Sequence, residues 1–203
     1  MGFYAKHILP RCLDIACSVG PIDKQRAKII PFAKGRVLEI GIGSGLNLPH
    51  YDAAQVDRVI GVDPDEHIWT RSQNRREAVS FPIERLGLSG EDIPMESNSV
   101  DTVVVTYSLC TIPDPVKALT EMRRILTTDG EILFCEHGRA PNKSVAKWQS
   151  RIDPIWSKLA GGCHSGRDIP NLFAQADLKI IELNQHYIPG PKVLSYNYWG
   201  RAH

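Results

Sequence analysis

A short apolar run that breaks into glycines constrains the fold of this chain more than any other feature. Residues 37–40 are typical of a buried strand, and Gly41, Gly43 and Gly45 follow at alternate positions. Glycine lets the backbone turn sharply and pass close to a ligand, because no Cβ stands in the way. The dinucleotide fingerprint has its third glycine one position later, where this chain has Leu46. The run therefore predicts a cofactor loop of another kind or, as the alternative, a tight structural turn.

Size and charge limit the possible classes of protein. A chain of 203 residues and 22.6 kDa predicts one domain over residues 1–203, enough to bury roughly 70% of the unfolded surface. The 24 basic and 23 acidic side chains leave a formal charge of +1. Such a balance argues against a nucleic-acid partner and against electrostatic attachment to anionic lipid.

The cysteines and the hydropathy pattern indicate a reduced, soluble protein. The five cysteines include no CxxC pair, so we expect free thiols and no metal site. No apolar run approaches the length of a membrane span, and no signal-peptide region stands at the start of the sequence. We therefore expect a cytoplasmic location without stable membrane insertion.

Apolar segments alternate with amphipathic ones along the rest of the chain. This order predicts an α/β fold with a parallel sheet wound right-handedly and a cleft at the carboxyl ends of the strands. The expected strands are residues 37–40, 56–62, 82–88, 99–105 and 131–136, with a turn at 127–130. The expected helices between them are residues 64–79 and 114–126.

Asp63 follows the second predicted strand, about 20 residues after the glycines, where this class of fold places an acid that binds a ribose. Its carboxylate can accept hydrogen bonds from both ribose hydroxyls. A capping role for the Asp63-Pro64 pair is the alternative. Asp65 is the expected cap of the helix that follows.

Residues 1–34 are predicted to form a helical cap, with helices in residues 4–16 and 22–33. The first helix could pack on the core, cover the cofactor as a lid or lie on a membrane surface. Tyr4 and His7 are candidates for contact with the substrate if this segment is a lid.

The glycine run with Glu39 before it resembles motif I of class I S-adenosylmethionine (SAM) methyltransferases. From about residue 36 to the end, the chain resembles methyltransferase-like proteins that act as small-molecule thiol S-methyltransferases, and bacterial phospholipid-methyltransferase-like proteins. Besides the glycine run, this resemblance depends on Asp63-Pro64, Ser108-Leu109-Cys110, Glu136-His137, Trp148-Gln149, Asp153-Pro154-x-Trp156 and Gly162-Cys163.

The resemblance implies a Rossmann-like sheet of seven mostly parallel strands. The last strand would be reversed, at residues 194–199 after a strand at 179–184. A helix at residues 144–159 would belong to a substrate-side insertion that follows the fifth strand and spans residues 140–170.

SAM is the cofactor that the resemblance implies, with S-adenosylhomocysteine as its product. SAM carries no phosphate, so the absence of a phosphate-binding lysine from the glycine loop agrees with it. Ser89 stands where many SAM enzymes have an acid, so contacts to adenine would come from the backbone of the next two residues. The residues expected to bind the cofactor are Glu39, Gly41, Gly43, Gly45, Asn47, Asp63, Pro64, Gly90, Glu91, Tyr107 and Ser108.

A small thiol, such as hydrogen sulfide or methanethiol, is the acceptor that the resemblance favours. The nucleophile is the thiolate, which is a few per cent ionised at neutral pH because the thiol pKa is about 8.5. His137 is the first candidate for a catalytic base, with Glu136 beside it to orient the ring. Asp153 and Arg167 are further catalytic candidates. The alternatives are a structural histidine and a salt bridge that fixes the inserted helix.

Tyr107, Leu109, Trp148 and Trp156 are expected to line a small acceptor pocket. The two tryptophans are eight residues apart and would share a helix face, so core packing is an alternative. Cys163 either joins this pocket or belongs to a hinge.

Two other functions remain open at this stage. One is N- or O-methylation of a lipid or a quinone-like metabolite. The other is a SAM-binding regulator without catalysis. The sequence does not define the oligomeric state.

Overall fold

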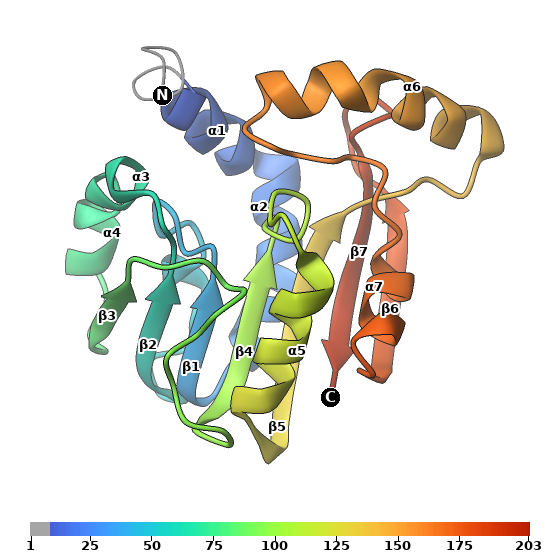
Figure 1. Ribbon diagram of the computed structural model, residues 1–203. Helices are drawn as coiled ribbons and strands as arrows, with labels where there is room; N and C mark the ends of the chain where they lie inside the picture. The colour runs from blue at the N-terminus through green and yellow to red at the C-terminus, as the bar shows by residue number, and fades with distance from the viewer. Residues whose placement is uncertain (1–8) are drawn as a thin grey trace.

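A computed structural model describes residues 9–203 and shows one sheet of seven strands (Figure 1). The strands follow the order β3-β2-β1-β4-β5-β7-β6. β7 runs antiparallel to both of its neighbours, whereas the other neighbouring strands pair in parallel. The predicted α/β fold with a reversed last strand is confirmed. The strands are β1 (Gly35–Ile40), β2 (Val56–Val62), β3 (Ile83–Leu86), β4 (Val100–Thr106), β5 (Leu126–His137), β6 (Ile180–Tyr187) and β7 (Tyr196–Ala202).

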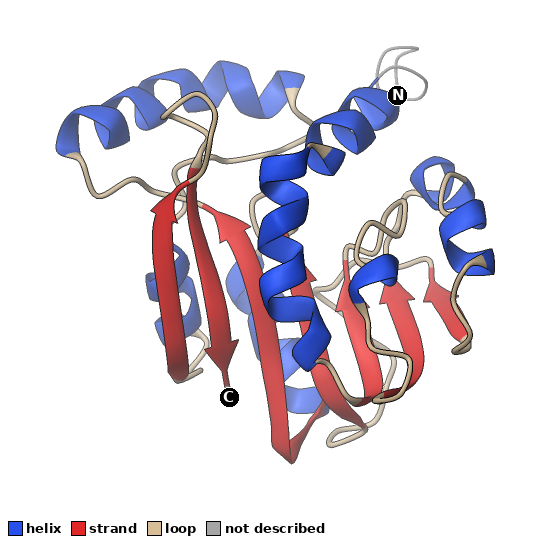
Figure 2. Cartoon of the chain, turned by 180° about the vertical axis from the view of Figure 1, so that it is seen from behind, coloured by secondary structure: helices blue, strands red, loops and turns tan. Residues whose placement is uncertain are grey.

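Helices cover both faces of the sheet, which is why its central strands are apolar at nearly every position. Figure 1 shows α5 and α7 on one face, and Figure 2 shows α2 on the other. Successive residues of a strand point to opposite faces. Val103 and Ile132 therefore pack in one core, and Val104 and Leu133 in the other.

Most helices begin at a side-chain cap or at a proline. The side chain of Asp114 accepts a hydrogen bond from Lys117 N at 3.0 Å at the start of α5, and Asn142 and Asp168 cap α6 and α7. The α-helices are α1 (Leu9–Ser18), α2 (Gly20–Ile29), α3 (Glu66–Thr70), α4 (Gln73–Glu77), α5 (Pro115–Ile125), α6 (Lys143–Leu159) and α7 (Ile169–Gln175). Short 3₁₀ helices are η2 (Ile30–Phe32) and η3 (Leu48–His50).

The single helix predicted over residues 64–79 is wrong, because two short helices, α3 and α4, occupy this segment. Asp65 is the cap of α3, as predicted, and accepts hydrogen bonds from His67 N and Ile68 N. The break lies at Ser72, whose buried hydroxyl donates to Trp69 O at 2.7 Å. A serine that bonds back to a nearby carbonyl competes with the regular helix pattern.

The turn predicted at residues 127–130 is also wrong. These residues lie inside β5, where the pairing with β4 passes from Val100–Leu126 directly to Thr102–Glu131. Four residues of β5, 127–130, therefore stand opposite a single residue of β4. The pairing of the two strands is interrupted there, but β5 continues through it.

α1 and α6 lie at the end of the sheet where the parallel strands finish (Figure 1). α6 is the helix predicted for residues 144–159, and it contains Pro154. Over residues 9–203, no helix combines the length and the apolar character needed to cross a bilayer.

Candidate active site

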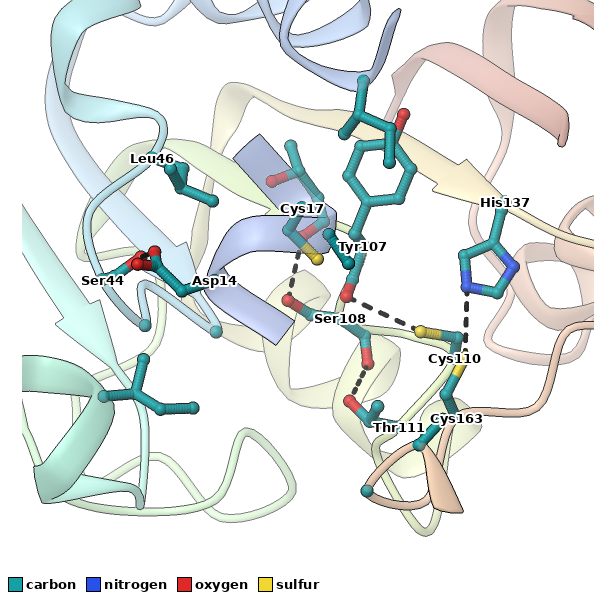
Figure 3. Close-up of a pocket in the computed structure, with 18 of the residues that line it drawn as sticks. Asp14, Cys17, Ser44, Leu46, Tyr107, Ser108, Cys110, Thr111, His137 and Cys163 are labelled. Carbon is teal, nitrogen blue, oxygen red and sulfur yellow. Dashed lines mark hydrogen bonds between the residues drawn. The ribbon is translucent and has the colours of Figure 1, made fainter. Parts of the chain in front are cut away.

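A cavity of about 750 Å³ opens at the carboxyl ends of the central strands. Its walls come from the glycine loop after β1, the ends of β2, β4 and β5, the helices α1 and α2, and the segment after α6. Figure 3 shows Asp14 and Ser44 on one side of this cavity and His137 and Cys163 on the other. The parallel sheet therefore brings the predicted cofactor loop and the predicted catalytic histidine into one space.

The glycine loop presents bare backbone to the cavity. Gly41 and Gly43 have φ angles of 71° and 49° and line the wall. A Cβ at Gly41 would collide with the side chain of Ser108. Gly45 is in the same conformational region but stands away from the cavity, where it packs against Leu48. The loop is thus a ligand-facing turn at its first two glycines only.

Asp63 lies at the end of β2 and lines the cavity beside this loop. Its two carboxylate oxygens accept hydrogen bonds from Gly43 N at 2.9 Å and from Asp65 N at 2.8 Å. Burial raises the pKa of Asp63, and these two bonds oppose the rise. The carboxylate is held against the loop and keeps lone pairs for a ligand, as the predicted ribose contact requires.

Glu39 lies on β1 under the loop and is almost fully buried. Its carboxylate accepts hydrogen bonds from Asn47 Nδ2 at 3.0 Å and from Tyr51 OH at 2.6 Å. Burial is the main reason why the pKa of Glu39 rises to about 7. Asn47 also donates to Thr106 Oγ1, so Glu39 fixes the orientation of an amide that lines the cavity.

Most of the other predicted cofactor residues also line the cavity. They are Pro64, Gly90, Tyr107 and Ser108, together with Ser89. Glu91 does not line it, because its carboxylate accepts hydrogen bonds from Ser89 Oγ and Asp114 N, each at 2.6 Å. Glu91 therefore connects the loop before α5 to the start of that helix.

The N-terminal helices supply two groups that sequence reasoning missed. Asp14 of α1 accepts hydrogen bonds from Ser44 of the glycine loop at 2.5 Å and from Arg71 at 2.9 Å. These bonds lower the pKa of Asp14 although burial opposes them. They place α1 over the loop, which favours the lid among the predicted alternatives. Tyr4 and His7 lie outside the described residues.

Arg26 of α2 is 3% exposed and lines the cavity. Its guanidinium donates to Cys17 O at 2.7 Å and lies 5.0 Å from the centre of the Tyr107 ring. One feature of the sequence could have pointed to a functional role for Arg26, because this residue shares a helix face with Ile22, Ile29 and Ile30. A charge on an apolar face is rare without a partner or a ligand.

His137 at the end of β5 faces Cys163, with Nε2 and Sγ 3.3 Å apart, and Cys110 lies beside them. Hydrogen bonds to the Cys163 sulfur lower the pKa of Cys163 to about 4 despite burial. The bond from the Cys110 thiol has the larger effect, and the bond from His137 the smaller one. Burial opposes an imidazolium, but the bond to Cys163 outweighs it and raises the pKa of His137. Both shifts favour a thiolate at Cys163 beside a protonated His137, and Nε2 of His137 is engaged by Cys163.

Glu136 does not orient His137, contrary to prediction. Successive side chains of a strand alternate in direction, and Glu136 Oε1 instead accepts from Ser108 N at 2.8 Å and Leu109 N at 3.0 Å. Burial raises the pKa of Glu136 to about 7. Its role is to hold the turn after β4, where Tyr107 has a φ of 51°.

Several of the other predicted catalytic and substrate residues lie away from the cavity. Asp153 of the inserted helix pairs with His164 Nδ1 at 2.7 Å, so the alternative of a salt bridge that fixes this helix is confirmed for Asp153. Arg167 instead donates to the carbonyl oxygens of Leu109 and Ile112, so that alternative is wrong for Arg167. Neither side chain lines the cavity.

Leu109 is fully buried in the core and also stands away from the cavity. Trp156 lines the cavity, whereas Trp148 is 57% exposed and stacks with Arg151. The prediction that both indoles line the pocket is wrong for Trp148.

Comparison with known proteins agrees with this geometry. Residues 38–134 match the family model of a methyltransferase domain. The chain is 32% identical to the thiol S-methyltransferase TMT1B of Homo sapiens, in an alignment that covers 77% of this chain and 66% of the relative. It is 31% identical to the TMT1B of Rattus norvegicus, over 72% of this chain and 61% of the relative. It is 28% identical to a phosphatidylethanolamine N-methyltransferase of Cereibacter sphaeroides, over 73% of this chain and 72% of the relative.

A SAM-dependent methyltransferase of Leishmania major has the same fold, with a TM-score of 0.71 and 15% identity over 98% of this chain and 80% of that one. The chain belongs to the class I SAM-dependent methyltransferases. The chain spans just under two thirds of the human relative's length, so the likeness concerns the methyltransferase domain.

The cavity of this class I methyltransferase fits SAM by its own chemistry. A Cβ would collide with Ser108 at Gly41 and would crowd Ile68 at Gly43, so bare backbone forms this part of the cavity wall and a ligand can approach it closely. Among the described lining residues, four are carboxylic acids and Arg26 carries the guanidinium. An acidic lining with a buried guanidinium suits a ligand that carries a sulfonium, an ammonium and a carboxylate. The four acids are Asp14, Glu39, Asp63 and Asp65.

Proposed function

We propose that this protein is a SAM-dependent methyltransferase whose acceptor is the sulfur of a small thiol. The observation that supports this most directly is the pairing of His137 with Cys163 at 3.3 Å in the wall of the cavity, away from the glycine loop. Relatives named thiol S-methyltransferases, at 29–32% identity, support the same class of acceptor.

The residues near the loop would hold the cofactor. Asp63 offers its carboxylate to the ribose, and the backbone at Gly41 and Gly43 forms the cavity wall beside it. Arg26 provides a positive charge for the carboxylate of the amino-acid tail. When bound, SAM supplies an electrophilic methyl group on a positively charged sulfur.

The residues near His137 would prepare the acceptor. A thiol reacts as its thiolate, and a positive charge nearby favours that form. His137 provides this charge, since its pKa is raised by Cys163 in spite of burial. His137 therefore stabilises an anionic sulfur and does not act as the free base that the sequence suggested.

The walls around this end of the cavity favour a small, apolar acceptor. Trp156, Ala160 and Ile112 line it together with Cys110. Apolar walls exclude water, which strengthens the attraction between a thiolate and the imidazolium. Position and a low local polarity would then supply most of the rate enhancement.

The test is a panel of acceptors incubated with SAM and the full chain, with S-adenosylhomocysteine measured by mass spectrometry. We expect product with hydrosulfide or methanethiol, and none with catechol or with phosphatidylethanolamine vesicles. His137→Ala should lower turnover at least about tenfold while SAM affinity stays within about twofold.

His186→Ala is the matched control, because His186 lies on β6 and does not line the cavity. Product from the lipid alone would refute the thiol assignment and favour the N-methyltransferase alternative. Binding of SAM without product from any acceptor would favour a non-catalytic regulator.

A further inference from the structure

Cys110, His137 and Cys163 form a compact cluster of potential metal ligands in the cavity wall. One ligand atom from each lies within 4.8 Å of the others. Cys110 follows β4, His137 ends β5 and Cys163 follows α6. Three segments that are distant in the sequence thus meet at one point, which Figure 3 shows beside Thr111.

Backbone contacts hold the two cysteine-bearing segments against each other. His164 N donates to Cys110 O at 2.9 Å. The Arg167 guanidinium donates to Leu109 O and, at 2.7 Å, to Ile112 O, on the two sides of Cys110. Gly161 and Gly162, with φ angles of 62° and 89°, allow the chain to turn back from α6 toward this point. The ligand positions are therefore built by the fold.

The donor set and its dimensions suit zinc. Zinc binds cysteine sulfur at about 2.3 Å and histidine nitrogen at about 2.0 Å in a tetrahedron, so neighbouring ligand atoms lie roughly 3.5–3.8 Å apart. His137 Nε2 and Cys163 Sγ are 3.3 Å apart, and every pair in the cluster is within 4.8 Å. Side-chain rotations that move the ligand atoms by about 1 Å or less would place them at three corners of such a tetrahedron.

We propose that Cys110, His137 and Cys163 bind one Zn²⁺ ion whose fourth position faces the cavity. All three residues line that cavity, so a fourth ligand can reach the ion from it. Sites with three protein ligands and an open position are typical of catalytic zinc, whereas structural zinc has four protein ligands. Binding displaces the proton of the Cys110 thiol and that of the imidazole nitrogen Nε2 into solvent, whereas Cys163 already favours its thiolate form.

Resting on the function proposed above, the fourth ligand is the acceptor thiol. A thiol that coordinates zinc loses its proton, which passes to solvent, and the acceptor is then held as a thiolate in the cavity. In the zinc-loaded protein the ion, held by His137, replaces the His137 proton as the positive charge beside the acceptor sulfur. The two cysteine thiolates balance the charge of the ion, and the nearby Arg167 interacts favourably with both thiols. An anionic fourth ligand is therefore electrostatically acceptable at this site.

The test measures metal binding directly. The full chain, reduced with a phosphine and freed of metal by a chelator, is titrated with CoCl₂ while the sulfur-to-cobalt charge-transfer absorption is recorded. We expect saturation at one equivalent, displacement of cobalt by ZnCl₂, and a spectral change when methanethiol is added. Cys110→Ser and Cys163→Ser should each reduce the charge-transfer intensity by about half and weaken zinc binding about 100-fold or more.

Cys12→Ser is the matched control, since Cys12 is an exposed thiol on α1, and it should bind cobalt as the unaltered chain does. Circular dichroism checks that each variant is folded. Absence of the absorption in the folded, reduced chain, or its full retention in Cys110→Ser and Cys163→Ser, would overturn the proposal.

The same samples separate this proposal from the proposed function. Methylation of thiols by chelator-treated protein that shows no cobalt absorption would refute the zinc site and leave the thiol acceptor standing. Cobalt and zinc binding with the expected variants, but no methylated thiol, would support the site and refute the acceptor.

Discussion

Replacing Glu39 by glutamine removes a carboxyl group that is 1% exposed beneath the cofactor loop. The amide keeps the size of the side chain and can still bond to Asn47 and Tyr51, because both partners can donate or accept. The substitution therefore tests the charge at this position with little change in packing.

The expected effect follows from the pKa of Glu39, which burial raises from 4.5 to about 7. The folded chain then binds a proton that the unfolded chain has released, so stability is highest below about pH 4.5 and falls as pH rises to about 7. Each pKa unit corresponds to about 1.4 kcal/mol. Between pH 5 and pH 8 the Glu39 carboxyl should therefore cost about 2–3 kcal/mol of unfolding free energy.

Urea unfolding at pH 5 and pH 8 measures this cost. The unaltered chain should lose about 2–3 kcal/mol more than Glu39→Gln between the two values. Glu96→Gln, which removes an exposed carboxylate, should follow the unaltered chain. Equal pH dependence for Glu39→Gln and the unaltered chain would show that the burial of Glu39 does not govern its ionisation.

Three further predictions concern the cofactor, the lid and the insertion. Asp63→Ala should weaken SAM binding about 10- to 100-fold by calorimetry, because it removes the ribose acceptor and the bond to Gly43 N; affinity within about twofold of normal would refute the ribose role. Asp14→Ala should increase hydrogen exchange in α1, since its bonds to Ser44 and Arg71 are lost; unchanged exchange would contradict the lid. Gln149→Ala should lower the unfolding free energy by about 2–4 kcal/mol in urea, because the buried amide bonds to Ala140 N, Gly138 O and Ser165 O; a loss no larger than that of the exposed control Gln185→Ala would contradict this.

The fold could be predicted wherever the sequence pattern is local. The strand at Val56–Val62 has the predicted bounds, since a β-branched run before Asp63 is a signal within a few residues. The prediction of a single helix over residues 64–79 failed at Ser72, because hydrophobic periodicity does not register a side-chain bond such as that of the Ser72 hydroxyl to Trp69 O, although this bond is local.

The cofactor side of the site could also be predicted, because the ends of parallel strands meet by topology alone. Gly41, Gly43 and Asp63 all line the cavity. Glu91 was placed wrongly, because neither its backbone nor its side chain lines the cavity, and its carboxylate bonds to Ser89 and Asp114.

The sequence by itself determined the alternation of strands and helices and the loop that faces the cavity, because apolar periodicity and glycine positions act over short distances. The order of the strands in the sheet came from the structure. Only the tertiary structure decided that Glu136 holds the Ser108 turn while His137 meets Cys163 and Cys110. These three residues are separated by more than 20 positions along the chain and show no metal-binding spacing. Their meeting depends on the direction of each side chain and on the path of the segment after α6, which local sequence patterns do not encode.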